Sequence, residues 1–228
     1  GMLDLIAGWE AHQDALAAAG APIALSQVHL LAPIPRPSRN IICVGKNYRE
    51  HAKEFAQSGF EAGAVAGAEI DAYPAVFSKP PATVVGPGAT VETHPGVTDA
   101  IDYEVELALI IGKGGRNIAK ADANDHIIGY TNVNYVTARY RQKNHKQWYL
   151  GKALDTFCPM GPWITTADEV DATNLQVQSW VNGELRQDAN TSDLIFDNPT
   201  MIAINSAGAT LEPGDIIDTG TPQGEGIG

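Results

Sequence analysis

Short blocks of apolar or alternating residues, each of strand length, follow one another along most of this 228-residue chain. Glycine, proline, asparagine and aspartate separate the blocks, as they do around turns. The pair Asn182-Gly183 between two blocks is typical of a type I′ turn and predicts a β-hairpin. The predicted strands are residues 41–44, 75–78, 84–85, 102–111, 126–136, 176–181, 184–187 and 216–218.

Helical periodicity is found in fewer places. Residues 3–19 predict an amphipathic helix, and Asn47 followed by Glu50 resembles a helix start with a capping box. Residues 119–125 and 194–203 predict further helices. Because strands outnumber helices and do not alternate regularly with them, we expect a β-rich mixed α+β fold rather than a doubly wound parallel sheet.

A proline-stiffened stretch over residues 32–37 divides the chain unequally. We expect residues 1–38 to form an N-terminal appendage with its connector, and residues 39–228 to form the main domain. The 228-residue length and a hydrophobic content of 44% suit a globular protein with a sizeable core.

The predicted strand over residues 102–111 carries two acids near its beginning. Glu104 and Glu106 share a face because strand side chains alternate, and their Cα atoms should lie roughly 6.5–7 Å apart. Apolar residues continue both faces, so the strand reads as buried. Two buried like charges need compensation, for which a divalent cation is one explanation. An edge strand whose glutamates face water is the alternative, and the pattern alone slightly favours that alternative.

Charge and cysteine content narrow the class of protein. The net charge of −12 argues against nucleic acid and anionic membranes as partners, and no apolar run approaches the length of a membrane span. We see no signal peptide, and the two cysteines suit a reducing cytoplasm. Residues 138–152 nevertheless contain five basic residues and no acid, which suggests attraction of a small anion, although Arg141, Lys143 and Lys146 are better explained as a solvated surface.

His51 and Glu54 lie three residues apart on the helix predicted after Asn47, so their side chains share a face. A histidine oriented by a carboxylate is a common general base. Spacing alone favours an ordinary surface pair.

A set of sequence blocks in this chain resembles the fumarylacetoacetate hydrolase (FAH) family. The set is specific as a whole and extends from about residue 40 to residue 222. The blocks are Cys43–Glu54, Asp102–Ala108, Gly151–Phe157, Gly161–Trp163, Val181–Glu184, Arg186–Asp188, Asn190–Phe196, Leu211–Asp215 and Thr219–Pro222.

The resemblance implies an FAH-type β-roll of mixed sheets, a homodimer, and a divalent cation, Mg²⁺ with Mn²⁺ or Ca²⁺ as alternatives, held by two glutamates and an aspartate. It places the metal ligands at Glu104 and Glu106. The other implied residues are the catalytic His51, Glu54 and Lys152, and the substrate-binding Arg139, Gln142 and Thr221.

The chain departs from the family pattern at the third metal ligand. The position expected to be aspartate is Tyr135, and the aspartate expected after Arg139 is Tyr140. A phenol has a pKa near 10, so it ligates well only if a metal removes its proton. With fewer negative ligands, we expect metal binding to be weak or absent.

The resemblance implies a metal-assisted hydrolase that cleaves a C–C bond in acylpyruvate- or fumarylacetoacetate-like oxo-acids, as in the catabolism of aromatic compounds. Two alternatives stay open: an isomerase or decarboxylase of 2-oxo or 2-hydroxy dicarboxylates, and a degenerate member that binds oxo-acids without turnover. In each case the partner is a small anionic oxo-acid. The family usually continues beyond Gly228, so we expect the C-terminal end of the domain to be incomplete.

Overall fold

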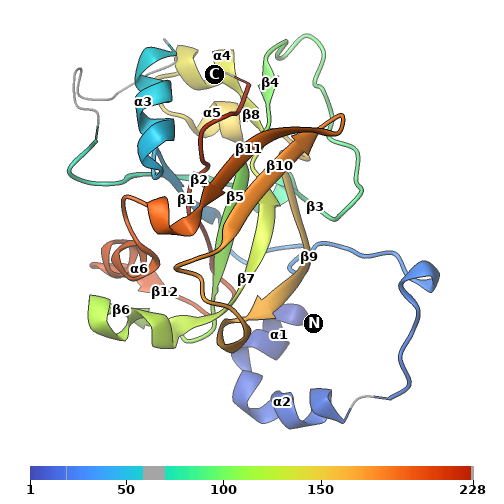
Figure 1. The fold of residues 1–228 in the computed structure, drawn as a ribbon. Coiled ribbons are helices and arrows are strands. Elements are labelled where there is room, and N and C mark those ends of the chain that lie inside the picture. The colour runs from blue at the N-terminus through green and yellow to red at the C-terminus, as the bar shows by residue number, and fades with distance from the viewer. Residues whose placement is uncertain (19, 59–69, 227–228) are drawn as a thin grey trace.

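A computed structural model describes residues 1–18, 20–58 and 70–226 of the chain (Figure 1). Its strands are β1 (Ile41–Gly45), β2 (Ala75–Lys79), β3 (Val84–Val85), β4 (Ile101–Asp102), β5 (Val105–Ile111), β6 (Gly115–Arg116), β7 (Ile127–Asn134), β8 (Thr137–Ala138), β9 (Cys158–Thr166), β10 (Gln176–Val181), β11 (Glu184–Asn190), β12 (Thr210–Leu211) and β13 (Ile216–Asp218). Its α-helices are α1 (Met2–Ala7), α2 (Trp9–Ala17), α3 (Arg49–Gln57), α4 (Arg139–Asn144), α5 (Tyr149–Lys152) and α6 (Asn198–Ser206).

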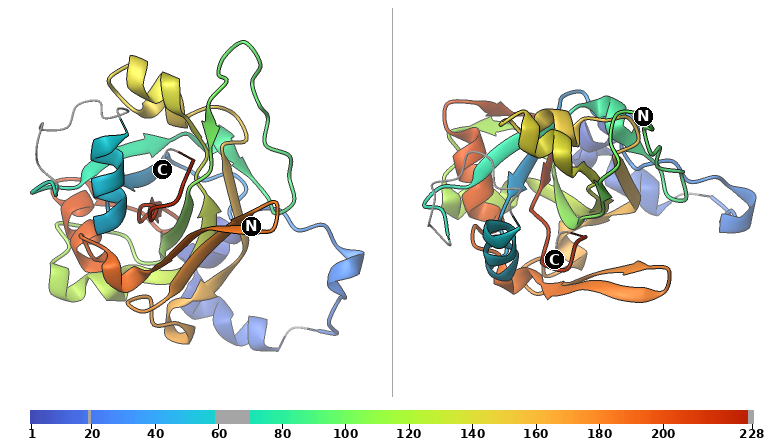
Figure 2. Two further views of the ribbon diagram at one scale, coloured as in Figure 1. Left: turned by 45° about the horizontal axis from the view of Figure 1, so that its top comes forward. Right: turned by 90° about the horizontal axis from the view of Figure 1, so that it is seen from above.

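The centre of the fold is a curled seven-stranded mixed sheet in the order β2-β1-β13-β5-β7-β9-β3. The pairs β1–β13 and β3–β9 are parallel, and the other neighbours are antiparallel. Helices α3, α4 and α5 gather at one end of the molecule, and α1 and α2 lie at the other end (Figures 1 and 2). The β-rich mixed α+β fold expected from the sequence pattern is confirmed.

Both faces of β5 are buried, as its apolar pattern predicts. Leu107, Leu109 and Ile111 belong to a core shared with α6. Ala108 and Ile110 face a second core that includes β1, β7 and β9. Glu104 and Glu106 lie at the beginning of the second face, so the sheet itself brings two acids into a buried environment.

The predicted hairpin is confirmed, and its turn has the expected geometry. Asn182 and Gly183 both have positive φ, 52° and 82°, as a type I′ turn requires. The hairpin β10–β11 packs beside β5, and the Gln187 side chain accepts a hydrogen bond from the Val105 N–H at 2.9 Å.

Two predicted helix starts lie elsewhere. The N-cap of α3 is Tyr48, while the Asn47 side chain binds the backbone of Phe196 and Thr219, because tertiary partners compete with local capping. Helix α6 begins at Asn198, and Asp197 caps it. The segment predicted as a helix over residues 119–125 is a 3₁₀ helix, Lys120–His126.

The N-terminal segment forms two short helices that meet at Gly8, followed by an extended chain that leads back to β1 (Figure 2). The boundary between residues 38 and 39 stays a prediction, and residues 227–228 of the predicted main domain lie outside the described residues. Within the described residues, no helix has the length and apolar character needed to cross a membrane.

Candidate active site

A small cavity of about 20 Å³ lies between the beginning of β5, the end of β1 and helices α3, α4 and α5. A space of this size holds about one water molecule. Its lining contains seven of the residues implied by the family resemblance. They are His51, Glu104, Glu106, Arg139, Gln142, Lys152 and Thr221.

Glu104 is held by three other side chains. Lys152 Nζ donates to both carboxylate oxygens, at 3.0 and 2.8 Å, and the Thr137 hydroxyl donates to Oε1 at 2.9 Å. Arg139 Nη1 forms an ion pair with the same oxygen at 2.8 Å. Burial disfavours the charged form of Glu104, but Lys152 and Arg139 outweigh it and lower the pKa to about 2. Glu104 is therefore a carboxylate held by two protein cations.

Glu106 has a different environment on the same face. Oε2 accepts the Gly220 N–H at 2.9 Å, and both Glu106 and nearby Asp218 are buried. Burial, Asp218 and Glu104 raise the pKa of Glu106 well above its ordinary value. Neither carboxylate oxygen of Asp218 has a hydrogen-bond partner, and burial raises the pKa of Asp218 to about 7.

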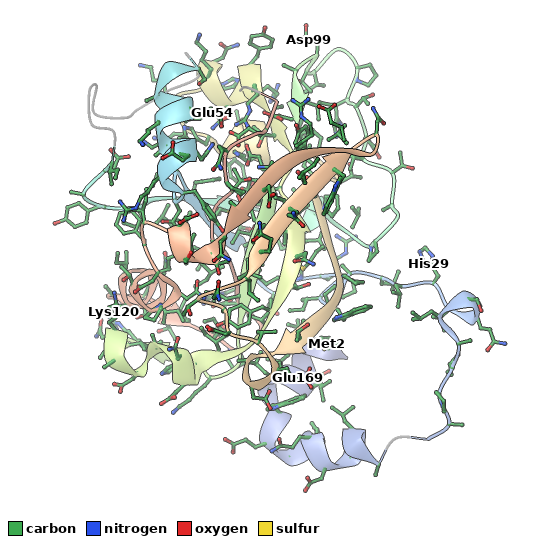
Figure 3. All side chains as sticks on the ribbon, in the orientation of Figure 1. Met2, His29, Glu54, Asp99, Lys120 and Glu169 are labelled. Atoms are coloured by element: carbon green, nitrogen blue, oxygen red, sulfur yellow. The ribbon has the colours of Figure 1, made fainter. Side chains whose placement is uncertain are left out.

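His51 lies between two carboxylates. Its Nδ1 atom is 3.1 Å from Glu225 Oε1 and 3.8 Å from Glu54 Oε2, although neither contact has the alignment of a hydrogen bond. Burial lowers the pKa of His51, but the contact with Glu225, its charge and the contribution of Glu54 outweigh burial and raise it to about 9. The predicted partner Glu54 is therefore the more distant of two. Figure 3 shows Glu54 on α3, far from the N-terminal helices.

Arg139 is buried, and each of its three guanidinium nitrogens lies within 3.2 Å of a carboxylate oxygen. Nε donates to Asp102 at 2.7 Å, and Nη2 reaches Asp102 at 2.7 Å and Glu225 at 3.2 Å. Nη1 contacts Glu104, and it donates to Gln142 Oε1 at 3.2 Å. The guanidinium group therefore links three acids rather than facing the cavity with free donors.

Tyr135 is fully buried, and its hydroxyl is hydrogen-bonded to a sulfur atom rather than free to bind a metal. The hydroxyl donates to Cys43 Sγ at 3.0 Å. Burial, and then Cys43, raise the pKa of Tyr135 well above 10. Two ammonium groups lie near the ring: Lys79 Nζ at 3.9 Å and Lys152 Nζ at 4.7 Å from its centroid.

The residues present do not suit a Mg²⁺ ion at the predicted position. Such an ion prefers several carboxylate and water oxygens in octahedral geometry. Glu104 is already paired with Lys152 and Arg139. The third position is occupied by a neutral phenol, which donates a hydrogen bond to Cys43 Sγ. Within residues 1–18, 20–58 and 70–226, the group with three ligand-type atoms within 4.8 Å of one another is His51, Glu54 and Glu225. These three lie beside the glutamate pair, and a protonated imidazole would partly balance the charge of the two carboxylates.

Larger hollows occur elsewhere on the surface, one of about 790 Å³ beside α1 and α2 and one of about 730 Å³ near α6. Neither brings together the convergent cations and buried acids that surround His51. Of the basic residues expected to be solvated, Lys143 and Lys146 are exposed and Arg141 is half-buried.

Sequence reasoning missed several acids and one lysine of this site. Asp102 precedes the two glutamates in the same block, and Lys79 ends a predicted strand, so their positions were visible although their roles were not. Asp218 and Glu225 come from the C-terminal segment after residue 215, where no local pattern connects them to His51 or Glu106. Only the tertiary fold places them there.

Comparison with known proteins identifies the family of this chain. The family model described as the fumarylacetoacetate hydrolase C-terminal region matches residues 40–228. The chain belongs to the fumarylacetoacetate hydrolase family.

The relatives include enzymes of more than one reaction type. The chain is 52% identical over 205 residues to oxaloacetate tautomerase YisK of Bacillus subtilis, covering 90% of the chain and 65% of that protein. It is 42% identical to the mitochondrial oxaloacetate tautomerase fahd2 of Xenopus laevis, covering 89% of the chain and 60% of that protein. The chain therefore spans less than two thirds of these relatives' length.

A solved structure with a similar fold is the maleylpyruvate hydrolase of Sphingobium sp. SYK-6, in complex with manganese(II) and pyruvate. The TM-score is 0.80 and the identity is 41%, with 99% of this chain and 76% of that chain covered. This relative shows that divalent metal binding occurs in the family.

Proposed function

We propose that the whole protein interconverts the keto and enol forms of a small 2-oxo dicarboxylate, and that this chain carries the residues that move the proton. The observation that carries the proposal is His51, which is held between two carboxylates and lines the same cavity as the Lys152 ammonium. The similarity to two oxaloacetate tautomerases supports the same reaction class.

His51 has the properties of a proton donor at neutral pH. Its pKa of about 9 keeps the imidazole protonated, so it can donate a proton to the enol carbon, and the neutral imidazole that remains can take up the proton that the enol hydroxyl loses. Glu54 and Glu225 stabilise the charged form. Hydrolysis would have to begin with a neutral His51 that activates a water molecule, whereas the conversion of enol to keto begins with the protonated form, so a tautomerase suits this histidine better.

Lys152 supplies positive charge where an enolate oxygen would lie. Its ammonium is fixed by both oxygens of Glu104, and a single charge-stabilising contact of this kind is typically worth about 10²–10³ in rate. Arg139, with every nitrogen paired, is assigned to holding Asp102, Glu104 and Glu225 in position. We assign Thr221 and Gln142 to contacts with substrate because both line the cavity.

Substrate entry requires side-chain movement, since the cavity holds only about one water molecule. The half-buried Trp148 is the lining residue best placed to move. Its ring packs on Phe77 and Phe55, with centroids 5.0 and 5.6 Å away. We assign no step to Mg²⁺, Mn²⁺ or Ca²⁺, because Tyr135 leaves the two glutamates without a third carboxylate. A homodimer and a cytoplasmic location remain predictions.

The proposal is tested by following the ultraviolet absorbance of enol-oxaloacetate as it converts to the keto form. We expect the His51→Ala variant to lose about 10²–10⁴ of the catalysed rate. His145→Ala, which changes an exposed histidine within the basic segment over residues 138–152, should match the wild type. Equal rates for His51→Ala and the wild type would contradict the assignment.

Hydrolysis of an acylpyruvate is the second candidate function, and the similarity to maleylpyruvate hydrolase favours it. A panel of acylpyruvates with and without added Mn²⁺ separates the two. Cleavage to pyruvate at rates above the keto–enol exchange would make the hydrolase reading correct. Binding of oxo-acids without either reaction would identify the chain as a non-catalytic member.

A further inference from the structure

The position that the family resemblance assigns to a divalent cation is surrounded here by protein cations. We propose that Lys152, fixed by Lys79 and accompanied by Arg139, takes the place of a divalent cation beside Glu104, and that Tyr135 is the residue responsible for this exchange. The ligand class would be a dianionic oxo-acid bound without metal. The inference concerns the same site as the proposed function. The class of ligand rests on the proposed function, whereas the exclusion of a metal ion does not.

The first step of the argument is the state of Tyr135. Its ring is fully buried and meets the edge of Phe77 with ring centroids 6.0 Å apart and an interplanar angle of 89°. Its hydroxyl proton is committed to Cys43 Sγ at 3.0 Å. Because both the ring and the hydroxyl of Tyr135 are fixed by these contacts, the side chain offers the site an aromatic ring and no charged oxygen.

The second step is the position of two ammonium groups at that ring. Lys79 Nζ lies 3.9 Å and Lys152 Nζ 4.7 Å from the Tyr135 centroid, both within the distance of a cation–π contact. An aspartate in place of the tyrosine would offer these cations a carboxylate instead of a π face, and would leave the space of the ring to water or a metal.

The third step is the way in which Lys152 is held. Lys79 is completely buried and donates to two carbonyl oxygens, that of Val136 at 2.7 Å and that of Lys152 itself at 2.6 Å. One buried lysine therefore fixes the backbone from which the other extends. The ammonium of Lys152 then reaches both oxygens of Glu104.

The fourth step is the cost of admitting a metal. A divalent ion that binds Glu104 competes with Lys152 and Arg139 for its two oxygens. Displacing Lys152 leaves a buried ammonium without its carboxylate, whereas Arg139 keeps Asp102 and Glu225. Within the described residues, no third carboxylate converges with Glu104 and Glu106 at metal-ligand distances, since Asp218 lies near Glu106 alone. Affinity at oxygen sites depends on ligand charge and number. Lys152 and Arg139 therefore compete with a divalent ion for Glu104 and disfavour its binding.

The test is a titration of the purified chain with Mn²⁺, in which free Mn²⁺ is measured by electron paramagnetic resonance. We expect the wild type to show no saturable binding at this site below about 1 mM. Tyr135→Asp should bind Mn²⁺ at least about tenfold more tightly than the wild type. Tyr140→Asp, which makes the same change at an exposed position, is the matched control and should behave like the wild type.

One further variant keeps the test informative if Tyr135→Asp fails to fold. Tyr135→Phe keeps the ring and, like the wild type, should show no saturable Mn²⁺ binding. Tight Mn²⁺ binding by the wild type would overturn the proposal, and its loss in Tyr135→Phe would then identify the phenol oxygen as a ligand.

Oxalate, a dianion that resembles an enolate, tests the ligand class. We expect its affinity for the wild type to change less than about twofold when EDTA is added. A loss of about tenfold or more with EDTA would show that a metal carries the binding and would overturn the exchange. A wild type that binds neither Mn²⁺ nor oxalate would support the cation exchange and count against the proposed function, so the two failures are distinguishable.

Discussion

The partnership of His51 with Glu225 has a measurable consequence for stability. Glu225 Oε1 lies 3.1 Å from His51 Nδ1, whereas Glu54 Oε2 lies 3.8 Å away, and the Glu225 side chain is fully buried while Glu54 is 22% exposed. Charges interact more strongly when water is excluded. We therefore expect Glu225→Gln, which removes the charge and keeps the shape, to lower the pKa of His51 more than Glu54→Gln does.

The magnitude follows from the pKa of His51, which is about 9 against an ordinary value of 6.5. At about 1.4 kcal/mol per pH unit, the difference is worth on the order of 3 kcal/mol. This figure is an upper bound for the pair, because burial raises the pKa of Glu225 even though His51 and Arg139 act to lower it. Glu104 also favours the charged imidazole.

The direction of the effect is set by linkage between protonation and folding. A histidine whose pKa is raised in the folded state contributes stability that is complete below pH 6.5 and is lost as the pH rises through 9. Burial lowers the pKa of Lys79 to about 8, so the contribution of Lys79 to the free energy of unfolding rises as the pH increases above 8. Burial raises the pKa of Asp218 to about 7, so the contribution of Asp218 to the free energy of unfolding falls as the pH rises toward 7 and is nearly constant above it.

Variants separate His51 from these other groups. The free energy of unfolding is measured by urea denaturation at pH 6, 7.5 and 9. We expect His51→Gln to remove the His51 contribution, Glu225→Gln to remove at least half of it, and Glu54→Gln to remove less. Imidazole resonances followed by NMR give the pKa directly. Equal effects of Glu225→Gln and Glu54→Gln, or a wild type with the same pH dependence as His51→Gln, would refute the reasoning.

Two further predictions concern the packing around the cavity. A Cβ at Gly45 would lie 2.3 Å from Trp148 Cζ3, so Gly45→Ala should displace the Trp148 ring. We expect the free energy of unfolding to fall by about 1–3 kcal/mol and the tryptophan fluorescence to change. Unchanged fluorescence would contradict this. The Asn47 amide joins β1 to the chain near α6 through Phe196 and Thr219, so Asn47→Ala should cost about 1–3 kcal/mol in urea denaturation, and a loss below that range would show that water replaces these bonds.

Local patterns were sufficient for much of the fold. The apolar runs at β1 and β5, the Asn182-Gly183 turn and the strand at β13 depend on residues close together in the chain, and each was predicted from them. The start of α3 was misplaced because Asn47 has the chemistry of a cap but finds partners more than 140 residues away. Local preference is weaker than several buried hydrogen bonds.

The acid pair Glu104 and Glu106 and the set of blocks from about residue 40 to residue 222 are properties of the sequence. The pair by itself left a water-facing edge strand slightly favoured, whereas the whole set was enough to predict the family and the missing third carboxylate at Tyr135. The way in which the acids are neutralised was decided by the tertiary structure. Lys152 lies 48 positions from Glu104, and Glu225 lies far along the chain from His51. Ion pairs between such residues exist only after the sheet has curled and excluded water, because burial is what makes an uncompensated charge costly.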